Sequence, residues 1–181
     1  MPDRTEIHAA GLEGYRALAH PLRVRIVRML RDRPMSASSL SRELDILPGS
    51  ARYHLRTLER AGIAQRAGER TIRGGREVLY SAPDVVRLDD DVAPAVRRAA
   101  DRAYLQDLGS VLDEASSAPG GVAGFSLQVR HLRPDDAAAA ERVVLEASRR
   151  FAELDHPDDP AAQPHALGTQ LVRLPPGSAH R

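Results

Sequence analysis

Residues 48–62 read PGSARYHLRTLERAG and predict one helix with two different faces. Pro48 suits a first helical position, and Gly62 suits the residue just past a helix end. We therefore predict a helix from about Pro48 to Ala61. Its apolar residues recur at the three- and four-residue spacing of one buried helix face, and they are Ala51, Leu55 and Leu58.

The opposite face of this helix is polar and basic. It carries Ser50, Arg52, Tyr53, Arg56 and Arg60. Arginine bonds guanine or phosphate, and tyrosine and serine reach phosphates or base edges. A solvated face with ordinary charges is the alternative interpretation of the same residues. His54 is expected to be packed or bonded to backbone rather than to act as a ligand.

Three shorter helical segments precede this helix. Pro21 starts the second segment, Pro34 ends it, and Ser36 is suited to cap the third. The apolar faces are Leu12, Tyr15, Leu18 and Ala19 in the first, Leu22, Ile26, Met29 and Leu30 in the second, and Leu40 and Leu44 in the third. The second segment's arginines, expected mostly on its outer faces, are Arg23, Arg25, Arg28 and Arg31. Two short helices joined by a few residues form a helix-turn-helix pattern.

Two strands are predicted after Gly62, over residues 63–70 and 76–82, with Val78 and Tyr80 at alternate positions of the second. A turn with the sequence RGGR, residues 73–76, joins them. The basic residues of this hairpin are Arg66, Arg70, Arg73 and Arg76. Such a hairpin beside a helix-turn-helix is a wing that grips the DNA backbone or the minor groove. An ordinary hairpin with a flexible tip is the alternative, but the order of the two motifs favours DNA binding.

The charge is divided unevenly along the chain. The 181 residues have a net charge of only +1, and all 26 basic side chains are arginine. Residues 1–83 hold 15 arginines against 9 acidic residues, a balance of +6. Residues 84–181 hold 11 arginines against 16 acidic residues, a balance of −5. The basic half is suited to a polyanion, and the acidic half is expected to do different work.

Composition excludes several classes of protein. The absence of cysteine excludes disulfides, thiolate nucleophiles and cysteine-based metal or redox sites. No apolar stretch is long enough to span a bilayer, and the N-terminus has no signal-peptide pattern, so we expect a cytoplasmic protein. No nucleophile motif or glycine-rich phosphate loop with lysine occurs. We therefore expect no catalytic residues, no cofactor and no enzymatic activity.

The first half resembles the winged helix-turn-helix of ArsR-type bacterial transcriptional regulators. The resemblance is carried by residues 17–27, ALAHPLRVRIV, and residues 53–63, YHLRTLERAGI, and it covers about Gly11 to Ala82. It implies a dimer that binds a near-palindromic operator, often as a repressor released by a signal. It also implies that Ser50, Arg52, Tyr53 and Arg56 face DNA and that Arg73 and Arg76 lie at the wing tip.

The chain departs from the metal-sensing members of that family. Residues 36–44 lack the family's Cys-x-Cys pair, and residues 84–116 contain no histidine. No metal site is therefore expected. A loose group of metal-capable residues in the second half is interpreted as solvated loop, and it comprises His131, His156, Asp158, Asp159 and His165.

The acidic half is less informative. A helix is predicted from about Val92 to Ala115, with dimerisation or intrachain packing as its role; its apolar positions include Leu108 and Leu112. A strand at residues 125–129, a helix from Pro134 and a strand at residues 167–171 predict a small α/β unit. The helix from Pro134 has an apolar stripe of Ala140, Val144, Ala147, Phe151 and Leu154.

These patterns together predict an α+β chain in three parts. Residues 11–83 form a winged helix-turn-helix domain, residues 84–118 a helical linker or dimerisation helix, and residues 119–176 a small α/β region. The predicted function is sequence-specific binding of double-stranded DNA by a homodimer that acts as a repressor, with an unknown small-molecule effector as a further partner and no membrane partner. The alternative is a winged-helix protein-interaction module that does not bind DNA.

Overall fold

The computed structural model describes residues 6–9, 11–83, 85–88, 92–117 and 134–154. The chain divides into two compact units, Met1–Ser110 and Val111–Arg181, which are described separately. This division falls inside a helix and does not test the predicted three-part organisation.

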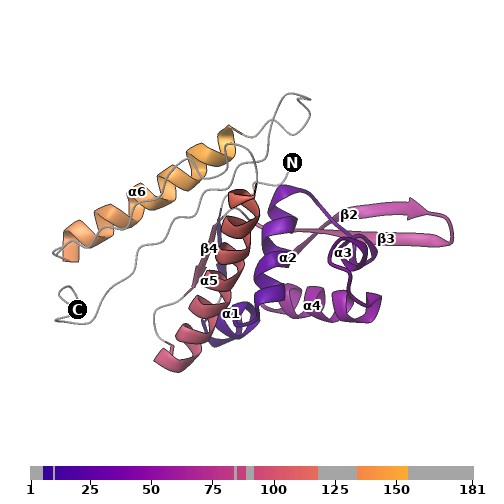
Figure 1. Ribbon diagram of the computed structural model, residues 1–181, viewed down its shortest axis with the longest axis horizontal. Coiled ribbons are helices and arrows are strands. Elements are labelled where there is room, and N and C mark those ends of the chain that lie inside the picture. Colours follow the sequence, from indigo (N-terminus) through magenta and orange to yellow (C-terminus); the bar gives the residue numbers. More distant parts are fainter. Residues whose placement is uncertain (1–5, 10, 84, 89–91, 118–133, 155–181) are drawn as a thin grey trace. The chain divides into compact units, whose positions relative to one another are not determined.

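The first unit contains four consecutive helices followed by a hairpin (Figure 1). The helices are α1 (Gly11–Leu18), α2 (Pro21–Asp32), α3 (Ala37–Glu43) and α4 (Pro48–Arg60). The hairpin strands are β2 (Gln65–Ile72) and β3 (Gly75–Ser81), which pair antiparallel. This order confirms the predicted α+β class and the arrangement of a helix-turn-helix followed by a wing.

One apolar core holds the helices and the base of the hairpin together. Ile26 and Leu30 of α2, Leu40 of α3 and Leu55 and Leu58 of α4 are essentially inaccessible to water. These are positions that helical spacing predicts to be apolar. Because α2, α3 and α4 each contribute to this core, burial orients α4 and leaves its other face to solvent.

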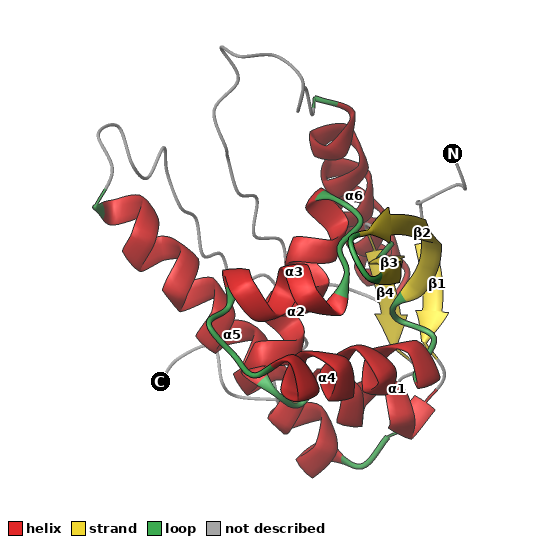
Figure 2. Ribbon diagram, turned by 90° about the vertical axis from the view of Figure 1, so that its right-hand side faces the viewer, coloured by secondary structure: helices red, strands yellow, loops and turns green. Residues whose placement is uncertain are grey.

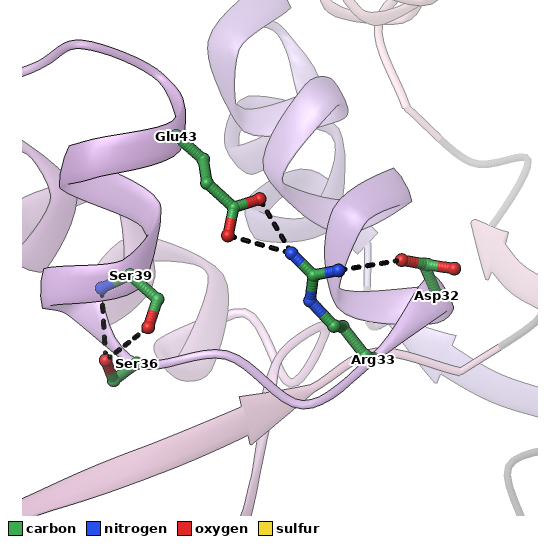
Figure 3. Close-up of polar contacts among 5 residues, drawn as sticks. All are labelled: Asp32, Arg33, Ser36, Ser39 and Glu43. Carbon is green, nitrogen blue, oxygen red and sulfur yellow. Dashed lines mark hydrogen bonds and ion pairs between the residues drawn. The ribbon is translucent and has the colours of Figure 1, made fainter. Parts of the chain in front are cut away.

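Side chains outside the core fix the ends of the helices. The His20 Nδ1 atom accepts a hydrogen bond from the backbone N–H of Leu22 at 3.2 Å and so caps α2. Ser36 caps α3 as predicted, because its hydroxyl accepts from the backbone N–H of Ser39 at 3.1 Å (Figure 3). Arg33, just after α2, contacts both carboxylate oxygens of Glu43 at 2.8 and 2.9 Å and thereby joins α2 to the end of α3 (Figure 3).

The hairpin boundaries differ from the prediction. Ile63 and Ala64 are buried and close the end of α4, because both of their N–H groups donate to the carbonyl of Leu58. β2 therefore begins at Gln65 rather than Ile63 and continues to Ile72. Gly75 pairs with Ile72 and belongs to β3, so the turn is shorter than the predicted four residues.

The first unit has a second, small sheet that the sequence did not predict. β1 (Glu6–Ala9) pairs parallel with β4 (Val85–Leu88) in a two-stranded sheet that is separate from the hairpin sheet, and Figure 2 shows the two strands side by side. The two strands are about 80 residues apart in the sequence and only four residues long. Such short strands carry too little alternation to be recognised.

α5 (Pro94–Ser116) starts two residues later than predicted, at the proline that suits a first turn. Its buried residues are Ala100, Ala103 and Asp107. Leu108 is only half-buried and Leu112 is exposed, so the predicted apolar stripe is wrong at its C-terminal end. Leu12 of α1 is likewise exposed, contrary to the prediction.

The second unit contains the end of α5 and α6 (Pro134–Glu153). α6 starts at the predicted proline, but Phe151 and Leu154 of its predicted apolar stripe are exposed. The predicted strands at residues 125–129 and 167–171 lie outside the described residues. Among the described helices, none combines the length and apolar character needed to cross a bilayer.

Candidate nucleic-acid interface

The two faces of α4 have opposite chemistry. Ala51, Leu55 and Leu58 are buried, whereas Arg52, Arg56 and Arg60 are exposed and Tyr53 retains 59% of its accessible surface. Ser50 is half-buried. The structure therefore brings four of the five predicted residues of α4 onto its solvent face, with Ser50 at the border.

This solvent face forms one shallow, open hollow. It is lined by Gly49, Arg52, Tyr53, Arg56, Glu59 and Arg60. Arg52 and Arg56 are one helical turn apart, a spacing that places their side chains side by side. A hollow that is open to solvent and bordered by guanidinium groups is suited to an extended anion more than to an enclosed small molecule.

The wing tip is exposed on both strands. Arg73 lies in the turn between the strands and Arg76 lies at the second residue of β3. The Arg76 Nη1 atom lies 3.4 Å from the Glu69 Oε2 atom across the hairpin. Gly74 has a φ angle of 105°, in a region that side chains disfavour, so this turn requires glycine.

Three other wing contacts involve carboxylates or helices of the same chain. The Arg66 Nε atom lies 2.8 Å from Glu59 of α4, and this bond raises the pKa of the Arg66 guanidinium. The Arg70 Nη2 atom lies 2.8 Å from Glu77. Glu77 also accepts a hydrogen bond from the Ser38 hydroxyl of α3, and these bonds, led by that of Ser38, lower the pKa of the Glu77 carboxyl.

The arginines of α4 and the wing thus divide into three groups. Arg66, Arg70 and Arg76 are paired with the chain's own carboxylates. Arg60 donates to a carbonyl of α4, the Arg56 oxygen, at 3.3 Å. Among the described residues, the arginines of α4 and the wing whose guanidinium groups have no hydrogen bond or ion pair within the chain are Arg52, Arg56 and Arg73. Sequence reasoning could not make this distinction, because the pairs join residues seven positions apart across two strands or between a helix and a strand.

The wing is attached to the helices at its base. Met35, just before α3, exchanges two backbone hydrogen bonds of 2.9 Å with Tyr80 of β3. These two backbone bonds, together with the Ser38–Glu77 and Glu59–Arg66 contacts, fix the base of the hairpin against α3 and α4. No such contact to a helix is found at the tip among the described residues, so Arg73 is exposed away from the base of the wing.

Buried His54, with the half-buried His20 beside it, supports α4 on the side opposite its solvent face. His54 is only 7% exposed, as predicted for a packed histidine, and its ring lies 5.0 Å from that of His20 and 5.3 Å from that of Tyr53. The His54 Nδ1 atom is buried without a hydrogen-bond partner. Burial lowers the pKa of both imidazoles; His20 and Arg23 lower that of His54 further, and Arg23 lowers that of His20 further.

Arg23 is the exception to the prediction that the arginines of α2 lie mostly on its outer faces, where Arg25 and Arg28 are exposed. It is only 9% exposed, and its guanidinium donates to the carbonyl oxygens of Ala17 and Arg16, the latter at 2.8 Å. Those carbonyls lie at the end of α1, where backbone acceptors have no partner within the helix. Burial lowers the pKa of Arg23, and the residue joins α1 to α2.

The described residues contain no group of three or more histidine, aspartate or glutamate side chains arranged to hold a metal ion. The histidines and aspartates singled out in the second half, at positions 131, 156, 158, 159 and 165, lie outside the described residues. The expectation that they form solvated loop stays a prediction.

Comparison with known proteins agrees with this geometry. A family described as "Helix-turn-helix domain" matches residues 18–65, which extend from the end of α1 to the start of β2. The HTH-type transcriptional repressor SmtB of Mycobacterium tuberculosis, in strains CDC 1551 / Oshkosh and ATCC 25618 / H37Rv, is 40% identical over 83 residues. The match covers 46% of this chain and 57% of the relative, so the chain spans somewhat over half of the repressor's length. The first half of this chain is thus a helix-turn-helix followed by a wing, and it is similar to the matched part of this transcriptional repressor.

Proposed function

We propose that this chain is a sequence-specific DNA-binding transcriptional regulator that acts as a repressor. The observation that carries the proposal is that the exposed guanidinium groups of Arg52, Arg56 and Arg73 have no partner among the described residues, while Arg66, Arg70 and Arg76 are paired with carboxylates. Free guanidinium groups on an exposed helix and on a wing are what phosphate and guanine binding require. The similarity to a curated repressor supports the same function.

In this proposal, α4 enters the major groove and the wing contacts the backbone or the minor groove. Ser50, Arg52, Tyr53, Arg56 and Arg60 are the proposed contacts from α4, and Arg73 and Arg76 those from the wing. Arg52 and Arg56 both line the open hollow, which supports base contacts for them. The pairing of Arg76 with Glu69 supports a weaker contribution from that residue than from Arg73.

We infer that the DNA-bound form is a homodimer, with the helix of residues 94–116 in the dimer contact. Two-fold symmetry would then set the recognition helices about 34 Å apart and select a near-palindromic operator. An effector that releases the repressor remains part of the proposal, as does a cytoplasmic location. Sedimentation of the complex on a single operator duplex measures the number of chains per site.

The deciding experiment is selection by the full chain from a library of random-sequence duplexes, followed by fluorescence anisotropy on the enriched duplex. Enrichment of two related half-sites is expected. An Arg52→Ala/Arg56→Ala double variant should lose at least tenfold in affinity, and Arg150→Ala, which removes a charge from α6, should not. If the chain binds neither the library nor random duplex at low salt, the protein-interaction module would replace the regulator as the proposed function.

A further inference from the structure

Leu47 is exposed at a position where an apolar residue has no structural advantage. It lies in the turn between α3 and α4 and, at 78%, is the most exposed of the large apolar side chains described. The preceding residue, Ile46, packs against the core. The core therefore takes the side chain of Ile46 and leaves that of Leu47 in solvent. The side chain at position 47 therefore lies in solvent, where a polar residue is favoured over an apolar one.

The helix gives a second reason to expect a polar residue here. Leu47 occupies the N-cap of α4 and makes no side-chain hydrogen bond to that helix. Serine, threonine, asparagine and aspartate are preferred at this position, because their oxygen accepts from the free N–H groups of the first turn. The chain uses Ser36 in this way for α3 but places leucine at the corresponding position of α4.

Gly49 is a second residue that does not favour the stability of α4. It lies in the first turn of α4 and has no positive φ angle. A Cβ atom built on Gly49 would meet no atom within 4 Å. Neither packing nor backbone conformation therefore requires glycine, and alanine would favour the helix. One use of a glycine at such a place is to let backbone approach a ligand closely.

These observations extend the proposed function and rest on it. We propose that Leu47 determines specificity by packing against the C5-methyl group of a thymine, and that Gly49 lets the start of α4 approach the groove floor closely enough for this contact. In a helix-turn-helix, the N-terminal residues of the second helix are those that reach base edges. The thymine methyl is the apolar group that the major groove displays, so an alkyl side chain selects thymine there.

The proposed contact between Leu47 and thymine is tested by removing the C5-methyl group of thymine from the DNA. In the duplex enriched by the wild-type chain, each thymine of the half-sites is replaced in turn by uracil, which lacks only that methyl. For the wild-type chain, one thymine in each half-site should prove sensitive, with a loss of about fourfold in affinity, the value of burying one methyl group. For Leu47→Ala, the same replacement should change nothing. Leu154→Ala, which removes an equally exposed leucine from the end of α6, should keep the wild-type sensitivity.

Two further variants separate recognition from folding. Leu47→Ser restores an N-cap and Gly49→Ala adds helix propensity, so each should raise the melting temperature by about 2–4 °C. Both should nevertheless weaken binding to the enriched duplex, by at least threefold. A residue with a merely structural role would not change stability and affinity in opposite directions.

The outcomes are distinct. Loss of thymine discrimination in Leu47→Ala alone supports the proposal. Equal discrimination in wild type and Leu47→Ala, or no thymine-sensitive position at all, would overturn it while leaving DNA binding by the arginines intact. If no duplex is enriched, the proposed function fails and this inference fails with it.

Discussion

Arg28 of α2 and Asp107 of α5 form a bidentate pair, with the Arg28 Nε atom 3.0 Å from Oδ2 and its Nη2 atom 3.3 Å from Oδ1. Asp107 is only 8% exposed, whereas the Arg28 side chain is 43% exposed. This pair joins the helix-turn-helix to the helix that follows the wing, and its two members sit in different environments.

That difference predicts unequal effects of removing either partner. Arg28→Ala leaves a buried carboxylate without its cation and should cost about 2–3 kcal/mol of unfolding free energy, somewhat below the value for fully buried pairs. Asp107→Ala leaves an arginine that can turn to water, and should cost about 1 kcal/mol. Urea denaturation of both variants measures the difference. Equal losses would show that burial of Asp107 does not govern the pair.

If α4 recognises bases, Arg56→Ala should lose DNA affinity by an amount that depends on the DNA sequence. If the guanidinium bonds a guanine, specific binding should weaken by about 1–3 kcal/mol, and preference at one operator position should relax. Gel-shift titration of variant and parent on the enriched duplex measures both effects. Arg150→Ala is the control for lost charge, because it also removes one exposed guanidinium group, on α6, that is not among the proposed DNA contacts. Equal affinity of Arg56→Ala and the parent would remove Arg56 from the interface.

The wing predicts a different signature, since phosphate contacts carry no sequence information. Arg73→Ala should lower affinity for all duplexes to a similar extent and reduce the slope of log affinity against log salt by about 1. Arg76→Ala should change the slope less, because Glu69 already competes for that guanidinium. Salt titrations by anisotropy decide, and an unchanged slope in Arg73→Ala would exclude a phosphate contact.

The buried histidines predict that stability falls with acidification. The pKa of His54 is lowered from 6.5 by burial, then by His20 and Arg23, and no carboxylate among the described residues is bonded to either ring. Above pH 6.5 the His54 imidazole is neutral in both the folded and the unfolded state, so its protonation takes nothing from the free energy of unfolding. As the pH falls below 6.5, the unfolded chain takes up the proton first and the folded state loses stability.

The loss should amount to at most about 1.4 kcal/mol per pH unit for each histidine, until the pH reaches the lowered pKa of the folded state. Urea midpoints at about pH 5 and about pH 7.5 measure it in the wild type. His54→Phe, which keeps a ring beside His20 and Tyr53, should show a smaller difference between the two. A midpoint that rises on acidification would contradict the assignment.

Much of the helix-turn-helix could be predicted from sequence because its signals are local. Pro21, Ser36 and Pro48 start helices by backbone geometry and capping, and Gly62, with a φ angle of 72°, ends α4 as a glycine is suited to do. Helical spacing also identified Leu55 and Leu58 as buried and Arg52 and Arg56 as exposed. Each of these features depends on residues within a few positions of one another.

Other features required contacts between distant segments. Spacing on α2 could not reveal that Arg23 is buried, because the carbonyls that accept its hydrogen bonds belong to α1. Nor could it reveal that Asp107, rather than Leu108, faces inward on α5, because Arg28 compensates the buried charge. The parallel pairing of β1 with β4 likewise joins segments about 80 residues apart.

The amino-acid sequence by itself determined where the helices and the wing lie and which face of α4 is basic, because periodicity and capping act over one or two turns. Only the tertiary structure decided which arginines remain free. Whether a guanidinium meets a carboxylate depends on strands and helices brought together by burial of the core, as Arg66 meets Glu59 and Arg70 meets Glu77 while Arg73 meets none of the described carboxylates.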